Sequence, residues 1–193
     1  WPSKENMGND SFNLVPGKAE HLLNMPKHDA PNPDIYSKTI LVEGPQSNLF
    51  YVGPVDGGDF KNFEFKVDVY THPGSASGIY FHTRYKNDGQ PVYGYEAQIN
   101  SSRRGESKTG SLVGASEVKT ATHKDNEWFT FYLKVDDKKV TIKVNDKIVN
   151  EFIETNDAEG PGSLRRGTIA FESTGARNSR VQFRDPMIRV LQK

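Results

Sequence analysis

Two stretches of the chain decide the fold: Ser77-Gly78-Ile79-Tyr80-Phe81-His82-Thr83-Arg84 and Gly94-Tyr95-Glu96-Ala97-Gln98-Ile99-Asn100. Each stretch has the period-two pattern of a β-strand, in which successive side chains point to opposite faces. One face of each predicted strand carries groups that can stack, donate, accept and titrate. These are Tyr80, His82 and Arg84 on the first strand, and Glu96, Gln98 and Asn100 on the second. Side by side, the two strands predict a polar, aromatic-lined floor of the kind that a sugar-binding cleft needs.

The same period-two alternation continues through most of the chain after residue 39. Residues 63–70 and 128–135 alternate cleanly, and 140–144 and 148–152 flank Asn145-Asp146, a hairpin signal. Shorter strands are predicted at 40–42, 49–52, 168–172, 181–184 and 187–191. Apolar residues spaced for a helix never persist for three turns. The pattern predicts an all-β protein, a two-sheet antiparallel β-sandwich or jelly roll.

The first part of the chain differs from the rest. Residues 1–38 are rich in Asn, Pro, Lys and Asp and show no sustained period. Proline disfavours helices and central strands. We therefore expect an irregular N-terminal arm packed on the domain, with a short strand near 12–15. A disordered tail is the alternative. Residues 39–193 form the predicted sandwich domain.

Composition limits the partners and the chemistry. The chain has 193 residues, 25 basic and 25 acidic, so its formal charge is zero, which argues against a general nucleic-acid binder. The pairs Arg103-Arg104 and Arg165-Arg166 are interpreted as solvated loop residues, with anion contact as the alternative. The chain lacks cysteine, which excludes disulfides, thiolate metal sites and cysteine nucleophiles.

No apolar run is long enough to span a bilayer. Because the chain begins at Trp1, we expect a removed leader and a periplasmic or secreted location.

Glu96 and His82 are the candidate catalytic residues. A carboxylate partly buried beneath a sugar would have a raised pKa and could act as a general acid or base. Histidine titrates near neutrality without any perturbation and is the natural partner. Gly78 has no side chain, so a ligand or a neighbouring strand can approach closely there. The alternatives are an exposed strand glutamate and an ordinary surface histidine.

Other motifs contribute less. Lys108 and Ser111 follow a polar loop and are predicted to contact sugar hydroxyls from the rim, although they would equally suit a plain hairpin loop. The remaining histidines lack the spacing of a zinc site, and Asn87-Asp88-Gly89 is interpreted as a turn rather than a calcium loop. A phosphate-cradling glycine loop and a nucleophile elbow are absent from the sequence. No metal and no cofactor are expected.

Several segments, in this order, resemble the 3-keto-disaccharide hydrolase family of glycosyl hydrolases. They are Ser77-Gly78-Ile79-Tyr80-Phe81-His82, Gly94-Tyr95-Glu96-Ala97-Gln98-Ile99, Thr109-Gly110-Ser111-Leu112, Glu127-Trp128 and Val181-Gln182-Phe183-Arg184-Asp185-Pro186-Met187-Ile188-Arg189. The similarity spans about residues 39–191. It implies a concanavalin-like jelly roll, export by a bacterium and action on oxidised sugars.

The resemblance implies cleavage of 3-keto-glycosides, with a saccharide as the partner. A ketone at C3 acidifies the C2 proton, so a modest base can start an elimination that expels the group at C1. Water can then add back. Glu96 and His82 would divide the proton transfers, and Arg84, Gln98 or Lys108 would stabilise the oxyanion. Substrate contacts are predicted for Tyr80, Arg84, Tyr95, Gln98, Asn100, Lys108 and Ser111.

Three alternatives remain open from the sequence. A direct two-carboxylate hydrolysis needs a second acid across the scissile bond, for which Glu172 and Asp88 are candidates. A non-catalytic, lectin-like carbohydrate-binding module would use the same stacking aromatics and polar groups. A scaffold domain would bind no sugar. The chain also departs from the family: Ser173-Thr174-Gly175 stands where many members have Asp-His-Gly, and Val113 stands where many have an aromatic residue.

Overall fold

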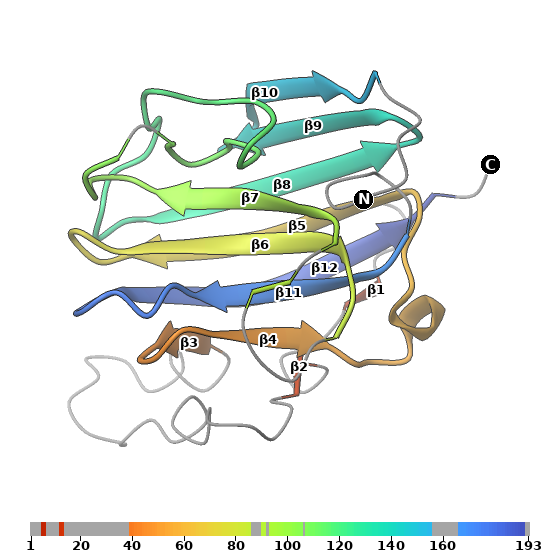
Figure 1. Cartoon of the computed structure of the whole chain (residues 1–193), viewed down its shortest axis with the longest axis horizontal. Helices are drawn as coiled ribbons and strands as arrows, with labels where there is room; N and C mark the ends of the chain where they lie inside the picture. The colour runs from red at the N-terminus through yellow and green to blue at the C-terminus, as the bar shows by residue number, and fades with distance from the viewer. Residues whose placement is uncertain are drawn as a thin grey trace.

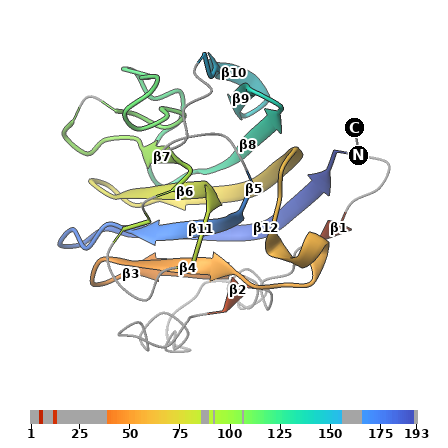
Figure 2. The same cartoon turned by 45° about the vertical axis from the view of Figure 1, so that its right-hand side comes forward.

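The computed structural model describes residues 5–6, 12–13, 39–85, 90–91, 93–105, 107–155 and 166–191. They form two antiparallel sheets stacked face to face, which confirms the predicted all-β sandwich (Figure 1). The two layers can also be followed in the turned view of Figure 2. In the described part of the chain, one short 3-10 helix, η2 (Val55–Gly58), interrupts the strands.

The sheet at the back of Figure 1 has seven strands, in the order β1-β12-β5-β8-β9-β10, with β3 also paired to β12. Their bounds are β1 (Glu5–Asn6), β3 (Thr39–Glu43), β5 (Phe63–Thr71), β8 (Trp128–Asp136), β9 (Lys139–Val144), β10 (Lys147–Ile153) and β12 (Arg180–Val190). The predicted hairpin is confirmed between β9 and β10: Asn145 and Asp146 have φ values of 49° and 64°. Asn and Asp tolerate this left-handed region better than most residues.

The sheet at the front has five strands, in the order β2-β4-β11-β6-β7. Their bounds are β2 (Phe12–Asn13), β4 (Ser47–Tyr51), β6 (Ala76–Thr83), β7 (Tyr95–Asn100) and β11 (Thr168–Ser173). The two strands that carry the polar pattern are therefore neighbours. Gly78 pairs with Gln98, and Tyr80 pairs with Glu96.

The hydrophobic core lies between the two sheets. The inward residues of the alternating strands are buried, and Phe171 of β11 stacks on Phe183 of β12 with ring centroids 4.1 Å apart. A single fully buried phenylalanine or leucine contributes roughly 1.5–3 kcal/mol to the hydrophobic stabilisation. Packing of this kind holds the five-stranded sheet rigid, and its outer face can then position functional groups precisely.

Strand β12 corrects the sequence-based prediction of two separate strands at 181–184 and 187–191. The structure has one strand whose pairing with β5 shifts between Arg184 and Met187. Asp185 lies there at a φ of 50°, and Pro186 has no N–H to donate to the ladder. The proline marks a bulge within the strand rather than its end.

The N-terminal arm is described only in two places. Glu5 and Asn6 pair with β12, and Phe12 and Asn13 pair with β4, at the position where the sequence predicted a short strand. The rest of the predicted arm lies outside the described residues. Among the described residues, no helix is long and apolar enough to cross a membrane.

Candidate active site

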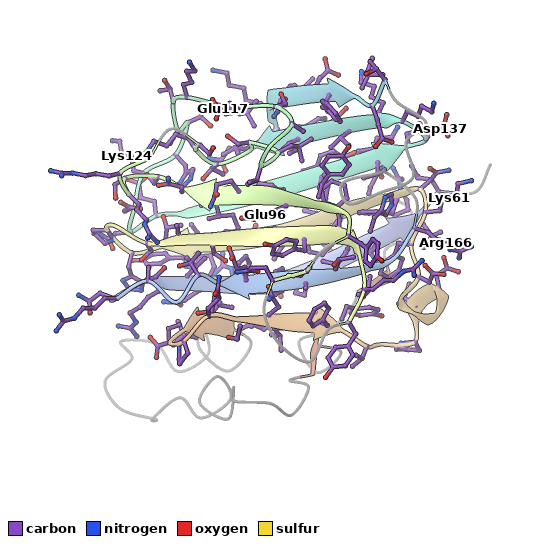
Figure 3. All side chains as sticks on the ribbon, in the orientation of Figure 1. Lys61, Glu96, Glu117, Lys124, Asp137 and Arg166 are labelled. Carbon is purple, nitrogen blue, oxygen red and sulfur yellow. The ribbon has the colours of Figure 1, made fainter. Side chains whose placement is uncertain are left out.

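The candidate site lies on the outer face of the five-stranded sheet. Strand register places Phe50, Ala170, Tyr80 and Glu96 in one row across β4, β11, β6 and β7. The next row contains Asn48, Glu172, Gly78 and Gln98. Figure 3 shows Glu96 over the middle of this sheet, whereas the other labelled charged side chains lie toward the edges of the molecule.

Gly78 allows the carboxyl groups of Glu96 and Glu172 to meet. A Cβ atom placed on Gly78 would lie 2.6 Å from Oε1 and 2.7 Å from Cγ of Glu96. The Glu96 side chain therefore occupies the space above the glycine and comes within hydrogen-bonding reach of Glu172 on the far side. Residue 78 thus acts through the absence of a side chain.

The pKa values of both carboxyl groups are raised above those of ordinary glutamates. Glu172 is only 6% exposed, and burial followed by the negative charge of Glu96 raises its pKa to about 7. Burial also raises the pKa of Glu96, although the hydrogen bond from Tyr80 works in the opposite direction. Oε2 of Glu172 is buried without a hydrogen-bond donor among the described residues, which a proton on the pair would supply. The arrangement favours an ionised Glu96 beside a protonated Glu172.

Tyr80 and Gln90 complete a hydrogen-bonded network around this pair. The Tyr80 hydroxyl lies 3.0 Å from Oε2 of Glu96 and 3.1 Å from Oε1 of Gln90 and can donate to either oxygen. Burial raises the pKa of Tyr80, so its hydroxyl stays neutral and remains a donor. Gln90 Nε2 donates to Oε1 of Glu172 at 2.6 Å. Sequence reasoning missed Gln90 because it lies in the β6–β7 connection, where no periodic pattern identifies functional residues.

Arg103 carries a positive charge that acts on Glu172. It follows β7, and its Nη1 donates to Oγ1 of Thr174 at 3.4 Å. Its charge lowers the pKa of Glu172, against the larger upward effects of burial and Glu96. The sequence interpretation had treated Arg103 as a solvated loop residue. Thr174 belongs to the segment in which the chain departs from the resembling family.

Of the predicted binding residues, Tyr80 and Gln98 share the outer face with Glu96. Gln98 Nε2 donates to the carbonyl of Ser77 at 2.8 Å. The Arg84 guanidinium instead lies 5.3 Å from the centroid of the Tyr93 ring. Tyr85 packs edge-on against Phe50, with ring centroids 5.4 Å apart, and supplies an exposed aromatic surface beside the apolar cluster of Phe50, Tyr80 and Ala170.

Tyr95 does not share this face, which corrects its prediction as a substrate contact. As the neighbour of Glu96 on a strand, it points to the opposite face, where its ring stacks on Phe81. Its hydroxyl donates to Oε1 of Glu154 at 2.9 Å. Tyr95 therefore belongs to the packing between the sheets.

Three further predicted contacts support the loop after β7. Asn100 Nδ2 donates to the carbonyl of Ser107, and Lys108 Nζ donates to the carbonyl of Arg103 at 2.7 Å. Ser111 is fully buried, and its hydroxyl bonds to the backbone of Val118 as both donor and acceptor. The geometry gives these three residues structural roles in the loop that carries Arg103.

The expectation that His82 shares a face with Tyr80 is wrong. His82 has a φ of 54°, and the β6–β11 pairing shifts next to it, so the alternation of the strand breaks there. Its ring packs against Phe63 and Phe81, and its Nε2 lies 2.8 Å from the carbonyl of Lys61. Burial lowers the pKa of His82 to about 4. Glu172, considered only as an alternative from the sequence, occupies the place beside Glu96.

We predict that His82 makes the fold sensitive to acid. Because its folded pKa of about 4 lies below the unfolded value of 6.5, the unfolded chain binds more protons between these pH values. The contribution of a neutral His82 is complete above pH 6.5 and falls as the pH drops toward 4. We expect the free energy of unfolding of wild type, relative to His82→Asn, to fall by about 2–3 kcal/mol between pH 7.5 and 4.5. Urea titrations at both pH values measure this.

The comparison with His82→Asn is needed because the raised pKa of Glu172 has the opposite effect. Its contribution is present below the unfolded pKa and is lost as the pH rises through about 7, in both proteins equally. Asparagine also tolerates the positive φ. A difference between the two proteins that stays constant with pH would contradict a neutral, buried His82.

The sequence singles out two other residues, Asp88 and Val113. Asp88 lies outside the described residues. Val113 is 43% exposed, and its backbone N–H donates to the carbonyl of Glu96 at 3.0 Å, so it borders β7 without adding an aromatic ring. Within the ranges that the structure describes, no three His, Asp or Glu side chains gather as metal ligands.

Solved structures share this sandwich. A protein from Parabacteroides distasonis, provisionally named a glycosyl hydrolase, has a TM-score of 0.65 at 20% identity, covering 80% of this chain and 81% of that one. The carbohydrate-binding module CBM66 from Bacillus subtilis has a TM-score of 0.54 at 11% identity, with 76% and 83% covered. The exoplasmic/lumenal domain of VIP36, in a Ca²⁺- and mannose-bound form, has a TM-score of 0.51 at 12% identity, with 81% and 80% covered. These likenesses establish the fold.

The family follows from the sequence match. Residues 41–189 match the family of 3-keto-alpha-glucoside-1,2-lyase-like domains, and the chain belongs to this family. No curated protein matches the chain closely enough to add a specific activity. The function is related to carbohydrates, in agreement with the polar and aromatic face described above.

Proposed function

We propose that the protein is an enzyme that cleaves 3-keto-glycosides by elimination across C1 and C2. The observation that carries this proposal is the meeting of Glu96 and Glu172 above Gly78. One ionised and one protonated carboxyl group, side by side, provide a base and a hydrogen-bond donor at the same pH. The family description supports the same reaction type.

In the first step the Glu96 carboxylate removes the proton from C2 of the sugar. The electrons of the broken C–H bond form a C2–C3 double bond, and the C3 ketone oxygen becomes an enolate oxygen. Protonated Glu172 is placed to donate a hydrogen bond to this oxygen and stabilise its charge. Tyr80, whose hydroxyl lies 3.0 Å from Glu96, orients the base.

In the second step the enolate collapses and expels the group at C1. The C3–O double bond re-forms, a C1–C2 double bond forms, and the C1–O bond breaks. The proton held by Glu96 moves to the leaving oxygen, so that one carboxyl group serves first as base and then as acid. Addition of water across C1 and C2 by the reverse proton transfers would give the free 3-keto sugar, and the net reaction is then hydrolysis.

A non-catalytic saccharide-binding module is the second candidate. The exposed rings of Tyr85 and Tyr93 favour it, because aromatic faces beside polar groups bind sugars without chemistry. Structural neighbours such as CBM66 are themselves named as binding modules. In either case the ligand is a saccharide. We also propose a location in the periplasm or outside the cell, which a carbohydrate-active domain fits.

The deciding experiment follows sugar release over time from a 3-keto disaccharide and from the same disaccharide before oxidation. We expect release from the keto substrate alone, because only the ketone makes the C2 proton acidic enough. Equal cleavage of both sugars would support direct two-carboxylate hydrolysis instead. Saccharide binding by calorimetry without release from either sugar would establish the binding module.

A further inference from the structure

We propose that Arg103 binds the C3 ketone oxygen of the substrate and stabilises the enolate that forms there. This inference rests on the proposed elimination and extends it, because it identifies the group that selects oxidised sugars. The argument uses the contacts of Arg103, the way its loop is held and the chemistry of the sugar.

The ionic environment of Arg103 differs from that of the three arginines on strand β12. Arg180 pairs with Glu43 at 2.8 Å, Arg184 with Asp68 at 3.4 Å, and Arg189 with Glu64. In the described part of the chain, no ion pair joins Arg103 to a carboxylate, although the residue is partly buried. A guanidinium held by one hydroxyl keeps most of its five N–H donors for a ligand.

The protein fixes Arg103 beside the carboxyl pair at two points. Lys108 Nζ donates to the Arg103 carbonyl and holds the loop. Oγ1 of Thr174 accepts from the guanidinium and lies 3.4 Å from the carbonyl of Ala76, on strand β6 two residues before Gly78. The charge of Arg103 is felt at Glu172, the carboxyl group proposed to face the enolate oxygen. Arg103 therefore lies on the Glu172 side of the pair.

The chemistry of the substrate matches this order of groups. C2 and C3 are adjacent in the sugar ring, so a base at C2 and a donor at the C3 oxygen must also be neighbours. Glu96 supplies the base, and Glu172 with Arg103 supplies two donors to the oxygen. An arginine only donates hydrogen bonds, so it suits a ketone or an enolate oxygen as its acceptor. The hydrogen bond becomes stronger as negative charge develops on that oxygen.

The test measures exchange of the C2 proton for deuterium by NMR, with a 3-keto disaccharide in D₂O. We expect Arg103→Gln to slow exchange and sugar release together by about 10²–10³-fold, the effect of removing one oxyanion donor. Arg103→Lys should recover part of the loss, because it restores the charge without the planar fork. Arg104→Gln, a change at the exposed neighbouring arginine, is the matched control and should exchange like wild type.

The outcomes separate the two proposals. Exchange by Arg103→Gln within threefold of wild type would overturn the role of Arg103 and leave the elimination standing. A wild-type protein that exchanges no C2 proton would overturn the elimination and the role of Arg103 with it. Equal loss in the Gln and Lys variants, with unchanged thermal unfolding, would also reject a charge-based role.

Discussion

Replacing Glu96 by glutamine is expected to lower kcat/KM on a 3-keto disaccharide by about 10²–10⁴-fold, the usual contribution of a positioned general base. Glutamine has nearly the same shape as glutamate, so it should still fit above Gly78 and accept the hydrogen bond from Tyr80. It cannot take the C2 proton. The initial rate of sugar release, measured at substrate concentrations well below KM, gives the effect directly.

The variant should keep its fold while it loses activity. Glu96→Gln removes a charge that is partly buried beside another carboxyl group, so the free energy of unfolding should be unchanged or slightly higher. Glu117→Gln is the matched control, since Glu117 is exposed on the loop after β7 (Figure 3). Full turnover by Glu96→Gln would exclude Glu96 as the base, and a loss of saccharide affinity alone would favour the binding module.

Glu172→Gln is expected to remove the fall in activity of the wild-type enzyme at alkaline pH. In wild type, Glu172 must keep its proton to donate to the enolate oxygen, and its pKa is raised to about 7. Above that pH, kcat/KM should drop about tenfold per unit and be about 100-fold below its plateau at pH 9. The amide of glutamine donates a hydrogen bond at every pH, so the variant at pH 9 should stay within about threefold of its own plateau.

This pH profile also separates the two catalytic mechanisms. If Glu172 only donates a hydrogen bond, the variant should retain measurable activity at its plateau. If Glu172 transfers a proton, as direct two-carboxylate hydrolysis requires, the variant should be inactive at every pH. The profile is measured from pH 5 to 9 with the uncatalysed rate subtracted at each point, and an alkaline fall that persists in Glu172→Gln would assign that fall to another group.

The strands could be predicted from the sequence because burial on one face imposes a period of two. The same pattern led directly to Gly78 and Glu96, which lie on the neighbouring strands β6 and β7. It failed at His82, where a positive φ turns the ring toward Phe63. Tyr95 was misplaced for a simpler reason, since adjacent residues on a strand cannot both face the site.

The rest of the site depends on contacts between distant segments. Glu172 lies 76 positions after Glu96 in the chain, and only the placement of β11 beside β6 brings the two together. Gln90 and Arg103 come from connections whose sequences carry no period. Arg103 is positioned by two contacts: Lys108 donates to its carbonyl, and Thr174 accepts from its guanidinium. Such contacts between residues in loops do not follow from the periodic pattern of the sequence.

The bare backbone at Gly78 has a consequence for how catalysts and lectins are related on this fold. Any larger residue at this one position would displace the Glu96 carboxyl group from Glu172. Burial would still raise the pKa of Glu172, but the Glu96 charge would no longer add to that effect, and the aromatic and amide groups around the two acids would remain. What is left is a surface fit to hold a sugar and unable to transform it. Under the proposed mechanism, a single methyl group at residue 78 would therefore be enough to turn a catalyst into a binding protein. A search for further catalysts among sandwiches of this type can begin by asking where a strand has no side chain between two acids.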